Sequence, residues 1–304
     1  MKIGIVGLPN VGKSTLFKLL TKVEVDIANY PFCTINPNIG CVKVPDERLQ
    51  KLALFSNSEK IIPTAIEFVD IAGLVKGAHQ GAGLGNKFLS HIREVDAILH
   101  LVRKFNDENI VHVDGSINAE RDEETINFEL IFADLATVEK RLQSVEKEVR
   151  SGNNEAKKTK EVLEKIKAGF NESKKARDLE LDEKERELIK ELNLLTIKPV
   201  LTIYNEDKDK FERDSKDIIK KSYEVLNLIT FFTTGKDETK GWTVQKGDKA
   251  PKAAGKIHSD MERGFIRAEV INREDLVNKS ANKRLEGKEY IIQDGDVCVF
   301  KFSV

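Results

Sequence analysis

Short apolar runs alternate with segments of helical spacing over the first hundred residues. The apolar runs end in polar or glycine-rich stretches, as strands do, and the segments between them repeat apolar residues every three or four positions, as helices do. The predicted strands are Lys2–Val6, Gly40–Val44, Thr64–Val69 and Ala97–Val102, with helices at Ser14–Thr21 and Gly85–Val95. A further strand, Lys198–Ile203, resumes the pattern much later. This alternation predicts an α/β fold with a largely parallel sheet.

A long helical segment interrupts this pattern from about Glu123. Its apolar residues are spaced alternately by three and four, which is a heptad seam: Phe128, Ile131, Leu135, Val138, Leu142, Val145 and Val149. A break at 151–154 precedes a second helix near Glu155, so the two are predicted to form an antiparallel coiled-coil hairpin. Another helix, Asp182–Leu195, opens with Asp182 and Glu185 at capping-box spacing. The simplest organisation is a helical insertion in the α/β domain.

The last part of the chain has the pattern of a small α+β module. Its predicted strands are Ile229–Thr233, Trp242–Val244, Phe265–Val270, Tyr290–Gln293 and Val297–Phe302, with one helix near Ala250–His258. Asp294-Gly295 has the chemistry of a hairpin turn before the last strand.

Composition narrows the function classes. The 304 residues carry 50 Lys+Arg and 51 Asp+Glu, a formal net charge of -1, so no global charge directs the chain to DNA or to a membrane. Three cysteines are too few and too scattered for a disulfide framework or a zinc site. With no signal-peptide pattern and no membrane-spanning apolar run, a soluble cytoplasmic protein is expected. Nothing in the sequence demands more than a monomer.

A phosphate-binding motif follows the first strand. Gly7 to Ser14 match G-x-x-x-x-G-K-[ST], between a predicted strand and a predicted helix, which is the context that the chemistry requires. The glycines let backbone N–H groups point at phosphate oxygens, and the helix N-terminus favours the negative charge. Lys13 is then predicted to reach the β- and γ-phosphates, and Ser14 to ligate Mg²⁺.

A second motif, Asp70-Ile-Ala-Gly73, follows the strand Thr64–Val69. Asp70 is predicted to hold Mg²⁺ directly or through water, and the Gly73 N–H to bind the γ-phosphate. Thr34 is the candidate for the remaining Mg²⁺ ligand; the alternative is an ordinary loop threonine. Leu74 stands where many GTPases have the glutamine that orients the attacking water, which predicts slow hydrolysis or another catalytic group.

Histidine is a residue type that could supply that missing group. His79 lies in a glycine-rich stretch and His112 lies beyond the strand Ala97–Val102; each is either a candidate catalyst or a surface or supporting residue. His100 lies within the apolar strand and is predicted to be a core residue.

The base-reading segment departs from that of a GTPase. Guanine selection normally uses Asn-Lys-x-Asp after the fifth strand, whereas here Tyr204-Asn205-Glu206-Asp207 follows Lys198–Ile203. Asn205 is placed to contact a base, but the guanine-selecting aspartate is missing at its usual spacing. Adenine is therefore the favoured base.

The predicted hairpin is basic. Lys140–Arg177 contains twelve Lys/Arg and six Asp/Glu. Such a surface either contacts RNA phosphates or is a solvated coiled-coil face, and both interpretations stay open.

Together these residues resemble the YchF family of Obg-like ATPases. The resemblance runs nearly end to end and rests on the stretches Gly7–Phe17, Asn29–Asn38, Phe68–Glu94, Ile229–Val244, Ala250–Ile271 and Glu286–Val297. It implies a Ras-like P-loop domain, a coiled-coil helical insertion and a C-terminal TGS domain of β-grasp fold. On this basis we expect a P-loop NTPase domain at 1–122 and 197–222, the insertion at 123–196 and the TGS domain at 226–304.

The resemblance also implies an activity and its residues. It implies an Mg²⁺-dependent ATPase, with ATP preferred over GTP, a low intrinsic rate, and association with ribosomes, with the large subunit favoured, or with RNA. The residues carried over for nucleotide binding are Asn10, Val11, Gly12, Lys13, Ser14, Thr15 and Asn205. Those for Mg²⁺ are Ser14, Thr34 and Asp70, and those for catalysis are Lys13, Gly73 and His112, the last on a loop that must move to reach the phosphate.

The chain departs from the family after Asn205. The family has a further helix, a final strand and a second base-contacting loop before its TGS domain, and the interval from Asn205 to Tyr223 is too short for them. The interval is either a true deletion or a gap in the sequence. We favour a gap, because a sheet without its last strand exposes an unpaired edge and half of the base pocket. Glu206 need not then be the family's glutamate.

Three functional hypotheses follow from these observations. The leading one is a slow nucleotide switch, in which ATP·Mg²⁺ orders Thr34 and Gly73 and hydrolysis releases them. The second is a nucleotide-gated module that docks on a ribosome or RNA with incidental hydrolysis. The third is a conventional GTPase.

Overall fold

The computed structural model describes residues 1–22, 36–74, 77, 84–207, 209–272 and 283–303. The chain divides into two compact units, each described by itself. The first comprises Met1–Leu19, Asn36–Ile39 and Phe68–Arg213; the second comprises Leu20–Ile35, Gly40–Glu67 and Asp214–Val304. The domain limits inferred from the sequence stay predictions.

A five-stranded sheet of order β2-β4-β1-β5-β6 carries the phosphate-binding motif. Its strands are β1 (Lys2–Val6), β2 (Ile39–Lys43), β4 (Ala65–Asp70), β5 (Ala97–Arg103) and β6 (Val200–Asn205). The central pairs are parallel, with Ile3 opposite Ala97 and Ile98 opposite Val200. Helices α1 (Lys13–Leu20) and α3 (Leu84–Arg93) follow β1 and β4 in the chain. The predicted α/β alternation is confirmed, and β6 forms one edge of the sheet.

The central strand β5 is buried along its whole length, including His100. Burial lowers the pKa of His100 to about 4, so the folded protein holds this ring neutral at pH values where an unfolded chain protonates it. The stability that this provides is complete above pH ~6.5 and is lost as the pH falls toward about 4.

We expect unfolding in urea to show about 3 kcal/mol of His100-dependent destabilisation between pH 7 and pH 4. His100→Gln, which cannot be protonated, should lack that part of the pH dependence. An equal pH dependence in both proteins would contradict the assignment.

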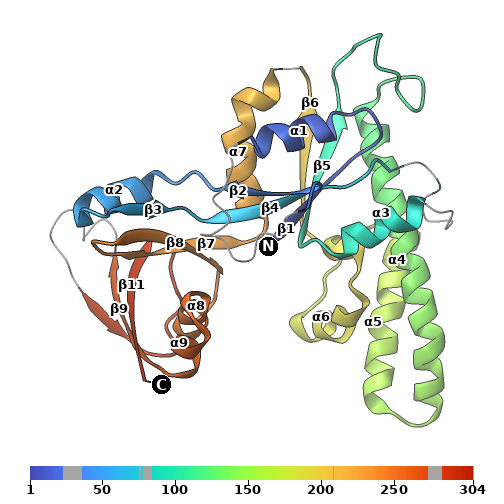
Figure 1. Cartoon of the computed structure of the whole chain (residues 1–304). Coiled ribbons are helices and arrows are strands. Elements are labelled where there is room, and N and C mark those ends of the chain that lie inside the picture. Colours follow the sequence, from blue (N-terminus) through green and yellow to red (C-terminus); the bar gives the residue numbers. More distant parts are fainter. Residues whose placement is uncertain (23–35, 75–76, 78–83, 208, 273–282, 304) are drawn as a thin grey trace. The chain divides into compact units, whose positions relative to one another are not determined.

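The helical insertion is an antiparallel hairpin of α4 (Ala119–Arg150) and α5 (Asn154–Asn171), which run side by side (Figure 1). Asn118 and Asn153 cap the helices with their side chains. The core of the hairpin includes Ile131, Val138, Val145, Val162, Ile166 and Phe170, much as the heptad predicts. The prediction that Phe128 begins this apolar seam was wrong. Phe128 is 39% exposed and stacks on Phe132, whereas the neighbouring Glu129 is buried.

A shorter helix, α6 (Glu183–Ile189), completes the insertion. The predicted capping box of Asp182 and Glu185 is present, although the helix ends at Ile189 and gives way to 3₁₀ turns at 190–192 and 195–197. The buried carboxylate of Asp134 on α4 accepts hydrogen bonds from the backbone N–H groups of Leu195 and Thr196 at 2.8 and 2.7 Å. This contact fixes the end of the insertion against α4 before the chain enters β6.

The second unit is built on a six-stranded sheet of order β10-β9-β11-β7-β8-β3. Its elements are α2 (Glu47–Ser56), β3 (Lys60–Ile62), β7 (Leu228–Thr234), β8 (Glu238–Gln245), α8 (Ala250–Ile257), α9 (Ser259–Arg263), β9 (Phe265–Asn272), β10 (Arg284–Glu286) and β11 (Asp296–Phe302). Helix α8 supplies Ala250, Ala253 and Ala254 to a core shared with Phe231 and Phe265. Helix α7 (Lys210–Val225) precedes β7.

Two predictions for this region were wrong. Tyr290–Gln293 forms no strand; Ile291 makes only an isolated bridge to Lys249, and the short strand β10 lies earlier. Asp294-Gly295 does not close a hairpin, because β11 pairs with β9 and β7 instead. Helices α2 and α7 and strand β3 were not predicted.

Two further observations concern the described residues. Among them, no helix is both long and apolar enough to cross a membrane. Cys298 is a free, buried thiol whose pKa burial raises, while Cys41 is disulfide-bonded, a pairing that was not predicted.

Candidate nucleotide site

The phosphate-binding loop joins β1 to α1 and has the backbone that its glycines permit. Gly12 has a φ of +100°, and a side chain there would meet the Asn205 amide nitrogen at 2.9 Å, so the position requires glycine. Asn10 has a φ of 63°, in the left-handed region, which Asn adopts more readily than most other residues with a side chain. Val11 is buried, while Thr15 is exposed in the first turn of α1.

Lys13 is the buried cation of this loop. Its side chain is 8% exposed, and Nζ donates a hydrogen bond to the Leu8 carbonyl at 2.8 Å, which curls the loop around the ammonium group. Burial lowers the pKa of Lys13 to about 8, and the nearby Asp70 carboxylate opposes the shift. A desolvated ammonium group of this kind is well suited to a strongly anionic ligand.

Ser14 and Asp70 meet beside Lys13. The Ser14 hydroxyl donates to Asp70 Oδ2 at 2.8 Å, and the Asp70 N–H donates to the Asn38 carbonyl at 2.9 Å. A hydroxyl and a carboxylate at this separation are the hard oxygen donors that Mg²⁺ prefers, so these residues fit the ion. Thr34, the third predicted ligand, lies outside the described residues, as does His79.

Gly73 lies against the phosphate-binding loop. A Cβ at this position would stand 3.0 Å from Lys13 Nζ and 3.1 Å from the Pro9 nitrogen, so glycine lets the two segments approach without crowding. The next residue, Leu74, donates its N–H to the Gly7 carbonyl at 3.2 Å and is fully buried. Its side chain is therefore part of the core and offers no polar group for hydrolysis.

Asn205 ends β6 next to the same loop. Its Nδ2 donates to the Val11 carbonyl at 3.0 Å, whereas its buried Oδ1 accepts no hydrogen bond from any described residue. A buried amide oxygen without a partner is costly, and a ligand with a donor group would relieve the cost. The acidic residues after it are engaged elsewhere: Glu206 pairs with Lys210 and Asp207 with Arg213, all at the exposed start of α7.

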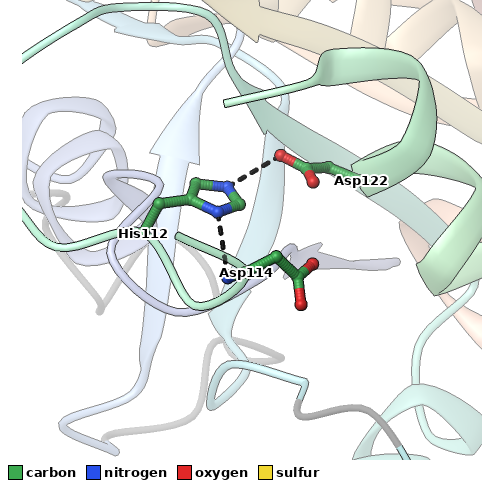
Figure 2. Close-up of side chains that lie close together, drawn as sticks. All are labelled: His112, Asp114 and Asp122. Carbon is green, nitrogen blue, oxygen red and sulfur yellow. Dashed lines mark hydrogen bonds and ion pairs between the residues drawn. The ribbon is translucent and has the colours of Figure 1, made fainter. Parts of the chain in front are cut away.

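The imidazole ring of His112 faces away from the phosphate-binding loop and contacts α4. The ring is 4% exposed, and Nε2 lies 2.8 Å from Oδ2 of Asp122, in the first turn of α4 (Figure 2). The Asp114 N–H donates a hydrogen bond to Nδ1 at 3.2 Å (Figure 2), which assigns the N–H of the ring to Nε2 as the hydrogen-bond donor to Asp122. The structure thus uses both ring nitrogens, and it brings His112 together with Asp122 rather than with Lys13.

The loop before His112 is nevertheless attached to the nucleotide site. The buried Arg103 guanidinium donates to the carbonyls of Phe105, Asp107 and Ile110, which shapes the loop after β5. The Asn10 amide then donates to the Val111 carbonyl at 3.1 Å. The backbone on one side of His112 therefore contacts the phosphate-binding loop while the imidazole contacts α4.

The basic residues of the hairpin are partly neutralised. Lys167 pairs with Glu139 at 2.7 Å, Arg141 with Glu148 at 2.9 Å and Lys165 with Glu185 at 3.0 Å. Lys157 and Lys158, at the start of α5, are exposed and have no ion pair with any described residue. The positive surface is therefore smaller than the charge count alone indicates.

A phosphate-binding loop between β1 and α1, with Ser14 and Asp70 in contact and Gly73 against Lys13, defines a P-loop nucleoside triphosphatase fold. Family models agree with this class. One described as "50S ribosome-binding GTPase" matches residues 2–133, and the YchF-GTPase C-terminal model, described as a protein of unknown function, matches residues 228–303.

Relatives that match this chain from end to end identify the family. "Ribosome-binding ATPase YchF" of Bacillus subtilis is 47% identical over 99% of both chains, and that of Escherichia coli O157:H7 is 43% identical over 100% of this chain and 99% of its own. The solved YchF GTPase of Schizosaccharomyces pombe is 35% identical, with a TM-score of 0.85 over 99% of this chain and 97% of that one. The chain belongs to the YchF family.

The comparison also shows a difference in length. The alignment with the Bacillus subtilis protein spans 361 positions, more than the 304 residues of this chain, so that protein has internal residues without a counterpart here. Among the described residues, β6 is the edge strand of the five-stranded sheet.

Proposed function

We propose that this protein is an Mg²⁺-dependent ATPase that binds ribosomes and acts as a slow nucleotide switch. The observation that supports hydrolysis most directly is the cluster of Lys13, Ser14, Asp70 and Gly73, in which a buried ammonium group, two oxygen donors and a closely packed glycine share one site. Bound Mg²⁺ would be held by Ser14 and Asp70 and would supply positive charge to the phosphates. The names of the relatives support the ribosome as partner.

The preference for ATP rests on Asn205. With Nδ2 engaged by the Val11 carbonyl, the free atom of the amide is the acceptor Oδ1. An unpaired acceptor favours the adenine edge, whose 6-amino group is a donor, over guanine, which has an oxygen at that position. In addition, Asp207 is paired with Arg213, so it does not replace the aspartate that selects guanine in GTPases.

The slow rate rests on Leu74 and His112. Leu74 is buried and apolar, and the imidazole of His112 is occupied by Asp122. The cluster can thus bind phosphates, but neither Leu74 nor His112 offers a polar group that could orient the attacking water in this arrangement.

A calorimetric titration of the full chain with ATP and with GTP, each with Mg²⁺, tests the proposal. We expect ATP to bind roughly tenfold more tightly or better, which is the effect of about one net hydrogen bond. Asn205→Ala should remove most of this preference, whereas Asn109→Ala, an exposed asparagine on the loop after β5, should retain it.

Tighter binding of GTP would overturn the ATPase assignment and favour the conventional GTPase. Equal affinities would overturn the role given to Asn205. If neither nucleotide binds, the short interval after Asn205 has removed a part of the chain that base recognition needs, and the mass of the purified protein tells whether the interval is real.

A further inference from the structure

We propose that Asp122 is a positioning residue that stores His112 in an inactive place and thereby limits the basal rate of hydrolysis. This inference rests on the proposed function, in which His112 acts at the phosphates. It adds a residue outside every motif considered so far, in the first turn of α4, which continues as one arm of the helical hairpin.

The contact between His112 and Asp122 is short, buried and supported by a neighbouring charge. Both side chains are buried, at 4% and 2% exposed, and the Nε2–Oδ2 distance is 2.8 Å. The other oxygen of Asp122 accepts from the Arg121 guanidinium at 3.0 Å, which fixes the carboxylate. A buried hydrogen bond to a charged group is among the stronger single contacts in a protein, so the ring leaves it seldom.

The same geometry argues against a metal at this place. His112, Asp114 and Asp122 lie close enough to share an ion, but Arg121 pairs with Asp122 at 3.0 Å and lies 3.7 Å from Asp114. A guanidinium group that already compensates both carboxylates disfavours a second cation. The cluster is therefore better explained as a storage site for the imidazole.

The surroundings allow the ring to leave. The Val111 side chain is 75% exposed, and His112 lines a hollow of about 610 Å³ together with Ile110 and Gly115. The turn after His112 contains Gly115 at a φ of +72°, with no other group near the place of a side chain. A rearrangement of this turn would move the imidazole without displacing the core, while the bond from Asn10 to the Val111 carbonyl keeps the loop at the nucleotide site.

Helix α4 carries a second buried carboxylate on the same face. Glu129 lies two turns after Asp122, and its Oε1 accepts a hydrogen bond from the Gly77 N–H at 2.6 Å. Gly77 follows Gly73, of the Asp-x-x-Gly motif, by four residues. One face of α4 therefore binds both His112 and Gly77.

Replacement of the carboxylate by its isosteric amide tests the storage role in the full chain. We expect Asp122→Asn to raise the basal kcat for ATP about tenfold with little change in KM, because an uncharged amide oxygen holds the imidazole less tightly than the carboxylate does, while the phosphate-binding loop is untouched. Asp122→Ala should raise it at least as much. Glu124→Gln, an exposed carboxylate on the same helix, should leave kcat at the wild-type value.

Chemical modification supplies a readout that does not depend on activity. Diethyl pyrocarbonate, which acylates accessible neutral imidazoles, should modify His112 slowly in the wild type and much faster in Asp122→Asn, with exposed His91 as the internal reference in peptide mass spectra. Thermal unfolding confirms that each variant is folded.

The outcomes separate the two proposals. If His112→Ala lowers kcat but Asp122→Asn neither raises kcat nor exposes the ring, the storage role is overturned. If Asp122→Asn exposes the ring without raising kcat, release does not limit the rate, and this inference is again overturned. If the ring is exposed and His112→Ala has no effect on kcat, the catalytic role of His112 in the proposed function fails.

Discussion

Lys13→Ala is expected to reduce ATP hydrolysis by at least a hundredfold and to weaken nucleotide binding by roughly ten- to a hundredfold. The variant removes a buried ammonium group whose hydrogen bonds to phosphate oxygens contribute about 1.5–3 kcal/mol, and it leaves the Leu8 carbonyl without its donor. Steady-state turnover and calorimetric titration with ATP and Mg²⁺ measure the two effects. Unchanged ATP affinity would refute the assignment of this loop to the phosphates.

Lys18→Ala is the matched control, because Lys18 lies on the same helix, α1, but is exposed. It should retain turnover and affinity close to those of the wild type. Comparable losses in both variants would point to destabilisation of α1, which thermal unfolding would reveal.

The second large effect is expected for His112→Ala. A positioned acid or base contributes typically ~10²–10⁴-fold to a rate, so we expect kcat to fall by about a hundredfold while ATP affinity stays nearly unchanged. Affinity should persist because the ring faces Asp122, and the Asn10 contact uses the Val111 carbonyl, which the substitution leaves in place.

His91→Ala provides the comparison, since His91 is exposed on α3. Single-turnover experiments distinguish chemistry from product release. If the two histidine variants hydrolyse ATP at the wild-type rate, His112 has only a structural role, held between Asp122 and the Asp114 N–H.

The sequence motifs predicted which residues lie together at the candidate nucleotide site, because they combine local chemistry with local structure. Lys13 and Ser14 follow β1, and Asp70 and Gly73 lie at and just after the end of β4. These strands are neighbours in the sheet, so the residues that follow them come together at one edge of it. Asn205 was expected to contact a base from its position after the strand Lys198–Ile203; its contact with the Val11 carbonyl and its unpaired oxygen became visible only in three dimensions.

The parts that were missed depend on contacts between distant segments. Strand β3 has three residues, and its partner β8 lies far along the chain, so its own pattern carries little signal. Tyr290–Gln293 has the composition of a strand, and Ile292 is buried in the core of the second unit. The segment nevertheless forms only one isolated bridge, from Ile291 to Lys249, and so is not a strand. Helix α2 could have been found: Asp46 is an N-cap, and Leu49, Leu52 and Ala53 have helical spacing.

The contact between His112 and Asp122 could not be predicted from the sequence for another reason. A histidine that precedes a helix by a few residues can face either the helix or the ligand. The sequence separation of His112 and Asp122 is the same in both arrangements, so it does not distinguish them. Glu129 was overlooked because the heptad assigned the neighbouring Phe128 to the interior.

The grouping of residues 40–67 with the C-terminal sheet has a consequence for how this protein can be divided. Leu49 and Leu52 of α2 form a cluster with Phe232 and Val297, β3 extends the sheet beside β8, and Arg48 pairs with Asp294 at 2.6 Å. A fragment that starts at residue 226 lacks Leu49 and Leu52, so it would expose Phe232 and Val297 to water and leave the edge of β8 unpaired. The C-terminal module therefore cannot be isolated as one continuous segment of the chain. The residues that complete its sheet and core, α2 and β3, lie in the sequence between β2 and β4 of the nucleotide-binding sheet.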